Sequence, residues 1–313
     1  MPDFSISRVN VVVDLIGIPF FLILVYVTIK HKKLQGTCHK LIGVYAACCI
    51  LAKIQILPPF IIMITKINVP LWLCALIDIL PIAGSFNIYS LMLVIAIDRI
   101  LSIFFPIWYS SRGDSFHFPF MYGISSLFPL TFIIFVIITT MQDPMRQNFC
   151  FLSDLITVKG EENFHVACLV FNWTTVACYI LLILKVFWEG KKGKLSTIKM
   201  ALFKSLFLIM GIQIGGWMFS SIGYYLVDKG FIKKFNEENN DLIGISINCI
   251  SSLSSTFEVP AIFLSSSEHR KALKKTLGYE TSSVYQMTVQ NKISPNKNPV
   301  MVQPATPKNI QKS

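Results

Sequence analysis

Apolar residues occur along the chain in long blocks, and short polar segments between the blocks hold most of the charges. Seven blocks are about 20 residues or longer, the length of an α-helix that crosses the hydrocarbon core of a bilayer. Unpaired backbone polar groups are too costly in lipid, so each block is predicted to be a helix. The predicted spans cover residues 9–29, 40–64, 73–97, 118–141, 164–188, 200–227 and 242–265.

The pattern predicts an all-α membrane protein, a seven-transmembrane helix bundle followed by a short amphipathic helix. In residues 266–277, Ala272, Leu273 and Leu277 can face lipid while basic neighbours meet anionic head groups. The polar segment that follows contains four prolines and is predicted to be disordered. The expected organisation is an extracellular N-terminus (1–8), the bundle (9–265), a membrane-surface helix (266–277) and a cytoplasmic tail (278–313).

Composition and charge agree with this interpretation. Of the residues, 53% are hydrophobic and only 14% are charged, whereas a soluble domain has about 25% charged residues. The net charge of +11 does not indicate nucleic acid, because the basic residues lie between apolar blocks and in the tail. With the N-terminus outside, 20 Lys and Arg residues are cytoplasmic and 7 are extracellular, as the positive-inside rule requires.

The cysteines show no spacing typical of a metal site. Six of the eight lie in or beside apolar blocks, where a thiol behaves as a small buried hydrophobe. Cys74 and Cys150 differ, because each lies beside a predicted outer loop.

The most informative motif is Asp98-Arg99-Ile100, at the inner end of the third span. Cys74 stands 25 residues before Arg99, and Pro106 stands seven residues after it. This combination resembles the Asp-Arg-Tyr motif of rhodopsin-like (class A) G-protein-coupled receptors, with isoleucine in place of tyrosine. An arginine near the bilayer boundary needs a partner, so Asp98 is expected to hold Arg99 at rest.

Residues 10–277 resemble the nematode serpentine chemoreceptors, most closely the class called sx. The resemblance implies a disulfide between Cys74 and Cys150, and the outer face of a cell is oxidising enough for one to form. It also implies that a group of inner-end residues forms the switch toward a G protein. That group is Asp98, Arg99, Pro106, Tyr179 and Pro260.

Four charged residues lie within apolar spans, where they are expensive and normally face the bundle interior. These are Asp14, Lys53, Asp78 and Glu258. Asp78, one turn below Cys74, is expected either to pair with a cationic ligand or to reach the outer interface. Lys53 and Glu258 come from spans that neighbour each other in the receptor fold, so we expect them to pair and to replace a sodium site.

The ligand pocket is expected, by analogy with such receptors, within the helix bundle. Its candidate lining residues are Asp78, Asn87, Gln213, Trp217 and Asn248. Each has the alternative role of an interhelical hydrogen bond. The seventh span contains no lysine that could bind retinal, so no cofactor is expected and the ligand should be diffusible.

The leading hypothesis is a chemosensory receptor in the plasma membrane, with sensory cilia as one site, that binds a small ligand and activates a heterotrimeric G protein. A neuropeptide receptor of the same fold is the first alternative, since acidic outer loops would suit a basic peptide. A channel or transporter is a distant alternative, because neither pore-lining charges nor duplicated halves are evident. No catalytic motif indicates an enzyme. Apart from ligand and G protein, the expected partners are membrane lipids, and nucleic acid is not among them.

Overall fold

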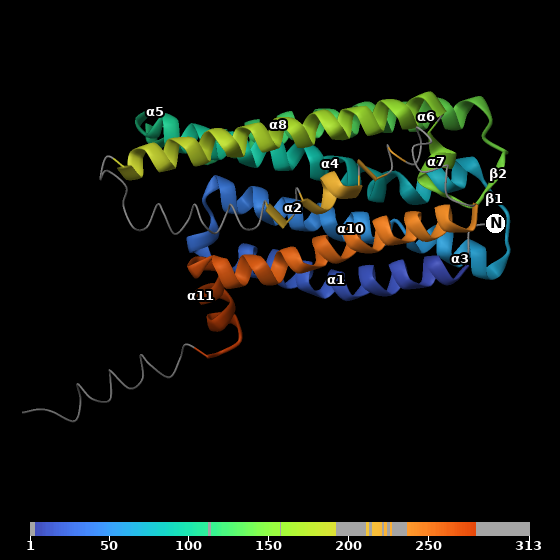
Figure 1. The fold of residues 1–313 in the computed structure, drawn as a ribbon, viewed down its shortest axis with the longest axis horizontal. Helices are drawn as coiled ribbons and strands as arrows, with labels where there is room; N and C mark the ends of the chain where they lie inside the picture. The colour runs from blue at the N-terminus through green and yellow to red at the C-terminus, as the bar shows by residue number, and fades with distance from the viewer. Residues whose placement is uncertain are drawn as a thin grey trace, which may run out of the picture. The chain divides into compact units, whose positions relative to one another are not determined.

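The structure, a computed structural model, is built almost entirely from helices (Figure 1). It describes residues 4–111, 114–156, 158–191, 211–212, 215–220, 222–223, 226 and 237–279. The first part of the described chain contains α1 (Phe4–Lys30), η1 (Lys32–Leu34), α2 (Thr37–Ile54), α3 (Leu57–Thr65), β1 (Val69–Pro70) and α4 (Leu71–Phe104). It continues with α5 (Pro106–Ser111), α6 (Asp114–Gln142), β2 (Gln147–Asn148), α7 (Leu152–Leu155), α8 (Val158–Lys191), α10 (Glu237–Ser265) and α11 (Ser267–Thr276).

Within the described residues, five helical segments are long and apolar enough to cross a membrane. They are Val9–Lys30, Thr37–Thr65, Leu71–Phe104, Phe116–Gln142 and Asn163–Lys191. They coincide with the first five predicted spans, and a shorter apolar helix, Cys249–Ser265, lies within the seventh. The predicted span 200–227 falls mostly outside the described residues, as does the predicted tail beyond Tyr279. The chain is therefore a helical membrane bundle.

Several helices extend beyond the predicted spans, as α4 does by seven residues at its C-terminal end and α8 by six at its N-terminal end. Two further differences concern the N-terminal segment and the second span. Helix α1 begins at Phe4, so most of the predicted extracellular segment 1–8 is already helical. The second predicted span is interrupted, because α2 ends at Ile54 and α3 begins at Leu57. Pro58 and Pro59 explain the interruption, since a proline has no N–H to donate to the carbonyl four residues earlier and kinks or breaks a helix when it lies beyond the first turn.

Helix α4 occupies the centre of the bundle. It packs against α2, α6 and α8. In its apolar stretch of 18 residues, 72% is buried inside the protein, compared with 22–28% in the corresponding stretches of the other candidate spans. A close approach of backbones makes this packing possible, because a Cβ on Gly84 would lie 2.6 Å from the Cβ of Leu51 on α2. Small residues serve the same purpose at helix interfaces in membranes generally.

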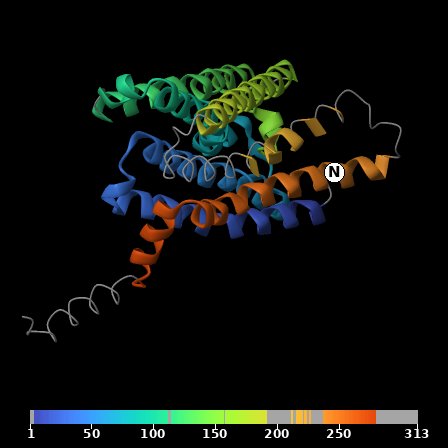
Figure 2. The same cartoon turned by 60° about the vertical axis from the view of Figure 1, so that its left-hand side comes forward.

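Helices far apart in the sequence also meet. Helix α10 packs along α1, and α1 packs against α2; the pairing of α10 with α1 is visible in both views (Figures 1 and 2). The beginning and end of the described bundle are thereby joined side by side. Polar residues on α1, α2 and α10 are consequently able to meet in the interior.

Candidate functional site

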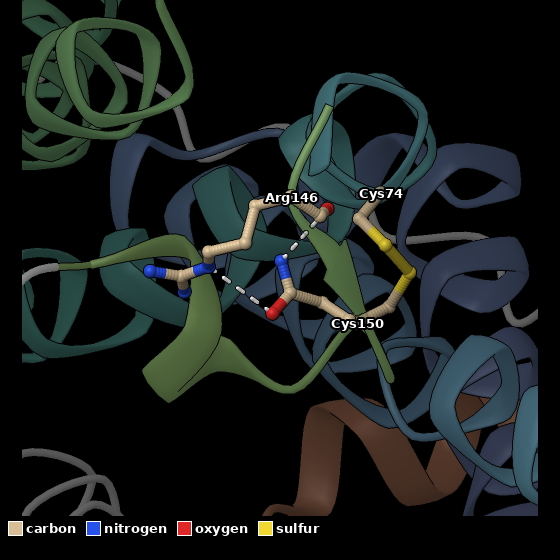
Figure 3. Close-up of a disulfide and its surroundings, with 4 residues drawn as sticks. Cys74, Arg146 and Cys150 are labelled. Carbon is tan, nitrogen blue, oxygen red and sulfur yellow. Dashed lines mark hydrogen bonds between the residues drawn. A yellow bond between two sulfur atoms is a disulfide. The ribbon is translucent and has the colours of Figure 1, made fainter. Parts of the chain in front are cut away.

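The N-terminal end of α4 is fixed by a disulfide. Cys74 and Cys150 are bridged, with their Cα atoms 5.1 Å apart, and both side chains are buried (Figure 3). The bridge that the family resemblance implied is therefore present. The segment that carries Cys150 lies against the start of α4, because β1 pairs with β2 in antiparallel register, Val69 opposite Asn148.

Further hydrogen bonds hold this segment in place. The backbone N–H of Leu71 donates to the carbonyl of Arg146 at 2.9 Å, and that of Trp72 donates to the carbonyl of Pro144 at 3.2 Å. Both donors belong to the first turn of α4, where a helix has no internal acceptors for its N–H groups. In Figure 3 the side chain of Arg146 bends back to Asn148, whose Oδ1 accepts from Nε at 3.3 Å.

Asp78 lies one turn of α4 beyond Cys74 and is buried, with 1% of its surface exposed. The alternative expectation, that its side chain reaches the outer interface, is therefore wrong, because this face of α4 packs into the buried cluster that contains Cys74 and Ala75. Neither carboxylate oxygen has a hydrogen-bond partner in the part of the chain that the structure describes.

The other predicted pocket residues have different surroundings. The amide of Asn87 donates to the sulfur of Cys48 at 3.6 Å, and its Oδ1 lies 3.1 Å from the hydroxyl of Ser90. Asn87 thus takes part in interhelical contacts. The ring of Trp217 packs edge-on against Tyr89, with ring centroids 5.1 Å apart. Gln213 and the side chain of Asn248 lie outside the described residues.

The charges inside the bundle form a network that joins three helices. The ammonium of Lys53 lies 2.8 Å from the carboxylate of Asp14 and 3.3 Å from the hydroxyl of Thr256. The hydroxyl of Ser252 donates to the same carboxylate of Asp14. Lys53, on α2, therefore connects α1 with α10 while remaining 5% exposed.

The expected pair of Lys53 with Glu258 is wrong. The carboxylate of Glu258 instead accepts a hydrogen bond from the hydroxyl of Tyr45 at 2.8 Å, and Lys53 is held by Asp14. The reason is geometric: Thr256 and Glu258 are two residues apart on α10, which places them about 200° apart around the helix axis. Lys53 lies on the side of α10 that carries Thr256. The side chain of Glu258 projects from the opposite side of the helix.

The C-terminal end of α4 carries a cluster around Asp98, which is fully buried. Its carboxylate lies 3.3 Å from the guanidinium of Arg99 and 3.1 Å from Nε2 of His117. The hydroxyl of Tyr109 donates to it at 3.0 Å. The contact with His117 was not predicted from the sequence. A single histidine just before the predicted span 118–141 does not indicate which residue it will contact.

The remaining members of the predicted switch lie as follows. Pro106 begins α5 directly after the end of α4, so the chain turns there and brings Tyr109 back to Asp98. Tyr179 on α8 is buried in the apolar cluster that also contains Val94 and Ile95. Pro260 lies within α10.

A second polar group is formed where α2 and α11 begin. Nε2 of His39 lies 3.0 Å from the carboxylate of Glu268, and the rings of His39 and His269 are 5.0 Å apart. Nδ1 of His269 lies 2.9 Å from the hydroxyl of Ser266. Burial, and secondarily the nearby His39, lowers the pKa of His269 to about 3, so its ring is neutral at physiological pH. Within the described residues, no group of three or more His, Cys, Asp and Glu side chains is placed to hold a metal ion.

These features together define a class: a multi-pass helical membrane protein with a disulfide at the N-terminal end of α4 and a buried acid paired with an arginine at the C-terminal end of the same helix. Residues 13–277 match the family of serpentine type 7TM GPCR chemoreceptors called Srsx. The match covers most of the chain, and the protein belongs to that family. No curated protein matches the chain.

Proposed function

We propose that the protein is a seven-transmembrane chemosensory receptor that binds a small ligand within its bundle and activates a heterotrimeric G protein. The observation that carries the proposal is the arrangement at the inner end of α4. Asp98 is buried and contacts Arg99, His117 and Tyr109, in a chain that belongs to a GPCR chemoreceptor family. A buried acid with several partners can hold an arginine in one position until the surrounding helices move.

The proposed orientation places the N-terminus outside and the C-terminus in the cytoplasm of the plasma membrane, with sensory cilia as one site. The excess of Lys and Arg in the predicted inner loops and tail supports it. The disulfide supports it independently, since Cys74 and Cys150 then lie on the oxidising side. Membrane lipids surround the bundle, and no enzymatic activity is part of the proposal.

The ligand is proposed to bind near the outer end of α4. Asp78 supports this position, because an ionisable group inside a membrane protein is a candidate for ligand binding by default. A neuropeptide is the alternative ligand of the same fold, and a channel or transporter remains the distant alternative.

The test is G-protein activation in cells that express the intact chain or Arg99→Ala, across a panel of small odorants, metabolites and amidated peptides. Arg146→Ala is the matched control, because Arg146 is an exposed arginine that contacts the opposite end of α4. We expect some compound to activate the intact chain and Arg146→Ala, while Arg99→Ala stays silent at equal surface expression. Equal activation of all three would contradict a switch at Arg99, and an activating peptide would favour the neuropeptide alternative.

A further inference from the structure

We propose that Asp78 is the anionic anchor of a binding site for a small organic cation with an apolar body, such as a primary amine on an aromatic or alkyl skeleton. This inference rests on the proposed receptor function and specifies the chemical class of the ligand.

The position of Asp78 follows from the periodicity of α4. Residues three and four apart share one face of a helix, so Asp78 lies on the same face as Cys74, Ala75 and Ile82. Those three residues are buried in one apolar cluster together with Cys150. The carboxylate is therefore placed among apolar side chains, one turn or about 6 Å along the helix axis from the disulfide.

Asp78 differs from the other buried acids because neither of its carboxylate oxygens has a polar partner among the described residues. The other acids inside the bundle each have a partner: Asp14 has Lys53, Asp98 has Arg99, and Glu258 has Tyr45. Among the described residues, no hydrogen-bond donor reaches either oxygen of Asp78. Burial of a carboxylate without a partner costs free energy and so destabilises the protein when no ligand is bound. We therefore expect this carboxylate to serve as the contact for a bound ligand. A cation that enters from outside would supply the missing charge.

The surroundings favour a cation that also has an apolar body. Two turns further along the same face of α4, about 12 Å from Asp78 along the helix axis, Phe86 packs against Phe132 and Phe164 with ring centroids 4.9 Å and 4.7 Å apart. Aromatic faces attract organic cations electrostatically, and predominantly apolar walls with one well-placed polar group are typical of small-molecule sites. An inorganic cation would gain little from these rings, and an anion would be repelled by Asp78.

The experiment uses two matched pairs of probes on the intact chain in nanodiscs: 2-phenylethylamine with 2-phenylethanol, and cyclohexylmethylamine with cyclohexylmethanol. Thermal unfolding and G-protein activation are measured for the intact chain, for Asp78→Asn and for Asp143→Asn. Asp143 is an exposed acid in the segment before β2, so its replacement controls for a general loss of negative charge.

We expect at least one amine to raise the Tm and to activate the intact chain and Asp143→Asn, while its matched alcohol does neither. In Asp78→Asn the amine concentration for a half-maximal response should rise roughly 30-fold or more, as when one partner of a buried charge pair is removed. Without any probe, Asp78→Asn should have a higher Tm than the intact chain, because the uncompensated acid is gone. A residue with a purely structural role would show the opposite change.

Three outcomes would overturn the proposal: no amine raises the Tm, the alcohols act as well as the amines, or Asp78→Asn lowers the Tm of the ligand-free protein. Activation by a neutral compound that is unchanged in Asp78→Asn would leave the receptor function standing and remove only the cation site. Amine stabilisation that depends on Asp78 but never activates a G protein would remove the receptor function and leave the site.

Discussion

The ammonium of Lys53 on α2 lies 2.8 Å from the carboxylate of Asp14 on α1, and this ion pair is almost entirely enclosed by the bundle. Hydroxyl groups of Ser252 and Thr256 extend the pair to α10. A Cβ on Gly17 would lie 2.7 Å from Cε of Lys53, so the glycine leaves room for the lysine chain. One charged side chain thus joins three helices that are widely separated in the sequence.

Loss of one partner of this pair should cost more than loss of both. Lys53→Met leaves Asp14 without its counter-charge and is expected to lower the free energy of unfolding by about 3 kcal/mol, as for other buried pairs. Asp14→Leu combined with Lys53→Met should recover most of that loss. A double-mutant cycle from thermal or denaturant unfolding of the purified protein measures the coupling. Lys271→Met, at an exposed lysine of α11, is the control, and simple additivity of the two changes would contradict the prediction.

Tyr109→Phe tests whether the partners of Asp98 hold the proposed switch at rest. The substitution removes one hydrogen bond to a charged group, which is worth about 1.5 kcal/mol or more. If the cluster stabilises the resting pair of Asp98 with Arg99, ligand-independent G-protein activation should rise by roughly tenfold.

The control for this measurement is Tyr26→Phe, because Tyr26 is an exposed tyrosine whose hydroxyl accepts a hydrogen bond from Lys30 on the same helix. It should leave basal activity unchanged at equal surface expression. A Tyr109→Phe protein with unaltered basal activity, but with normal activation by an agonist, would show that Tyr109 supports the fold without biasing the switch.

The approximate positions of the membrane spans could be predicted from a local signal in the sequence, and the disulfide from the family resemblance. Blocks of apolar residues define the spans, and the resemblance implied that Cys74 and Cys150 are bridged. The partner of Lys53 could not be predicted in the same way. A helix that crosses a membrane has apolar residues on all sides, so the pattern of apolar residues does not determine how the helix is rotated about its axis. The rotation of α2 and α10 decides whether Lys53 contacts Asp14 or Glu258.

Two further features depend on three-dimensional placement. The contact of His117 with Asp98 requires the C-terminal end of α4 and the N-terminal end of α6 to lie side by side, and no spacing in the sequence encodes that distance. The break before Leu57 does have a sequence signal, in Pro58 and Pro59. Within a long apolar block, however, a proline pair is compatible with either a kinked or an interrupted helix.

Gly84→Ala should weaken the centre of the bundle. Its new Cβ would lie 2.6 Å from the Cβ of Leu51 and 3.0 Å from the backbone carbonyl oxygen of Cys48, so α2 and α4 would have to separate. Overpacking of this kind costs about 1–3 kcal/mol. Gly123→Ala on α6 is the matched control, since nothing lies within 4 Å of its added methyl group. Surface expression and the Tm should fall for Gly84→Ala only, and equal Tm values for the two variants would refute the close packing.

The neutral state of His269 predicts a loss of stability in acid. The unfolded chain binds a proton at this histidine near the ordinary pKa of 6.5, whereas burial lowers the pKa in the folded protein to about 3. Between these pH values the unfolded state binds more protons, so the free energy of unfolding decreases as the pH falls from 7 toward 3. At pH 5 this group alone should remove about 2 kcal/mol relative to pH 8.

His269→Gln isolates this contribution, because glutamine is polar and does not titrate. Unfolding of the intact chain and of the variant is compared at pH 8 and pH 5, so that all other groups, including His39 and Glu268 beside it, contribute to both proteins. The variant should lose less stability on acidification than the intact chain, while His31→Gln, at a half-buried histidine after α1, should lose as much as the intact chain. Equal losses in all three proteins would mean that His269 accepts a proton at its ordinary pKa, and that the group it forms with His39 and Ser266 is open to water.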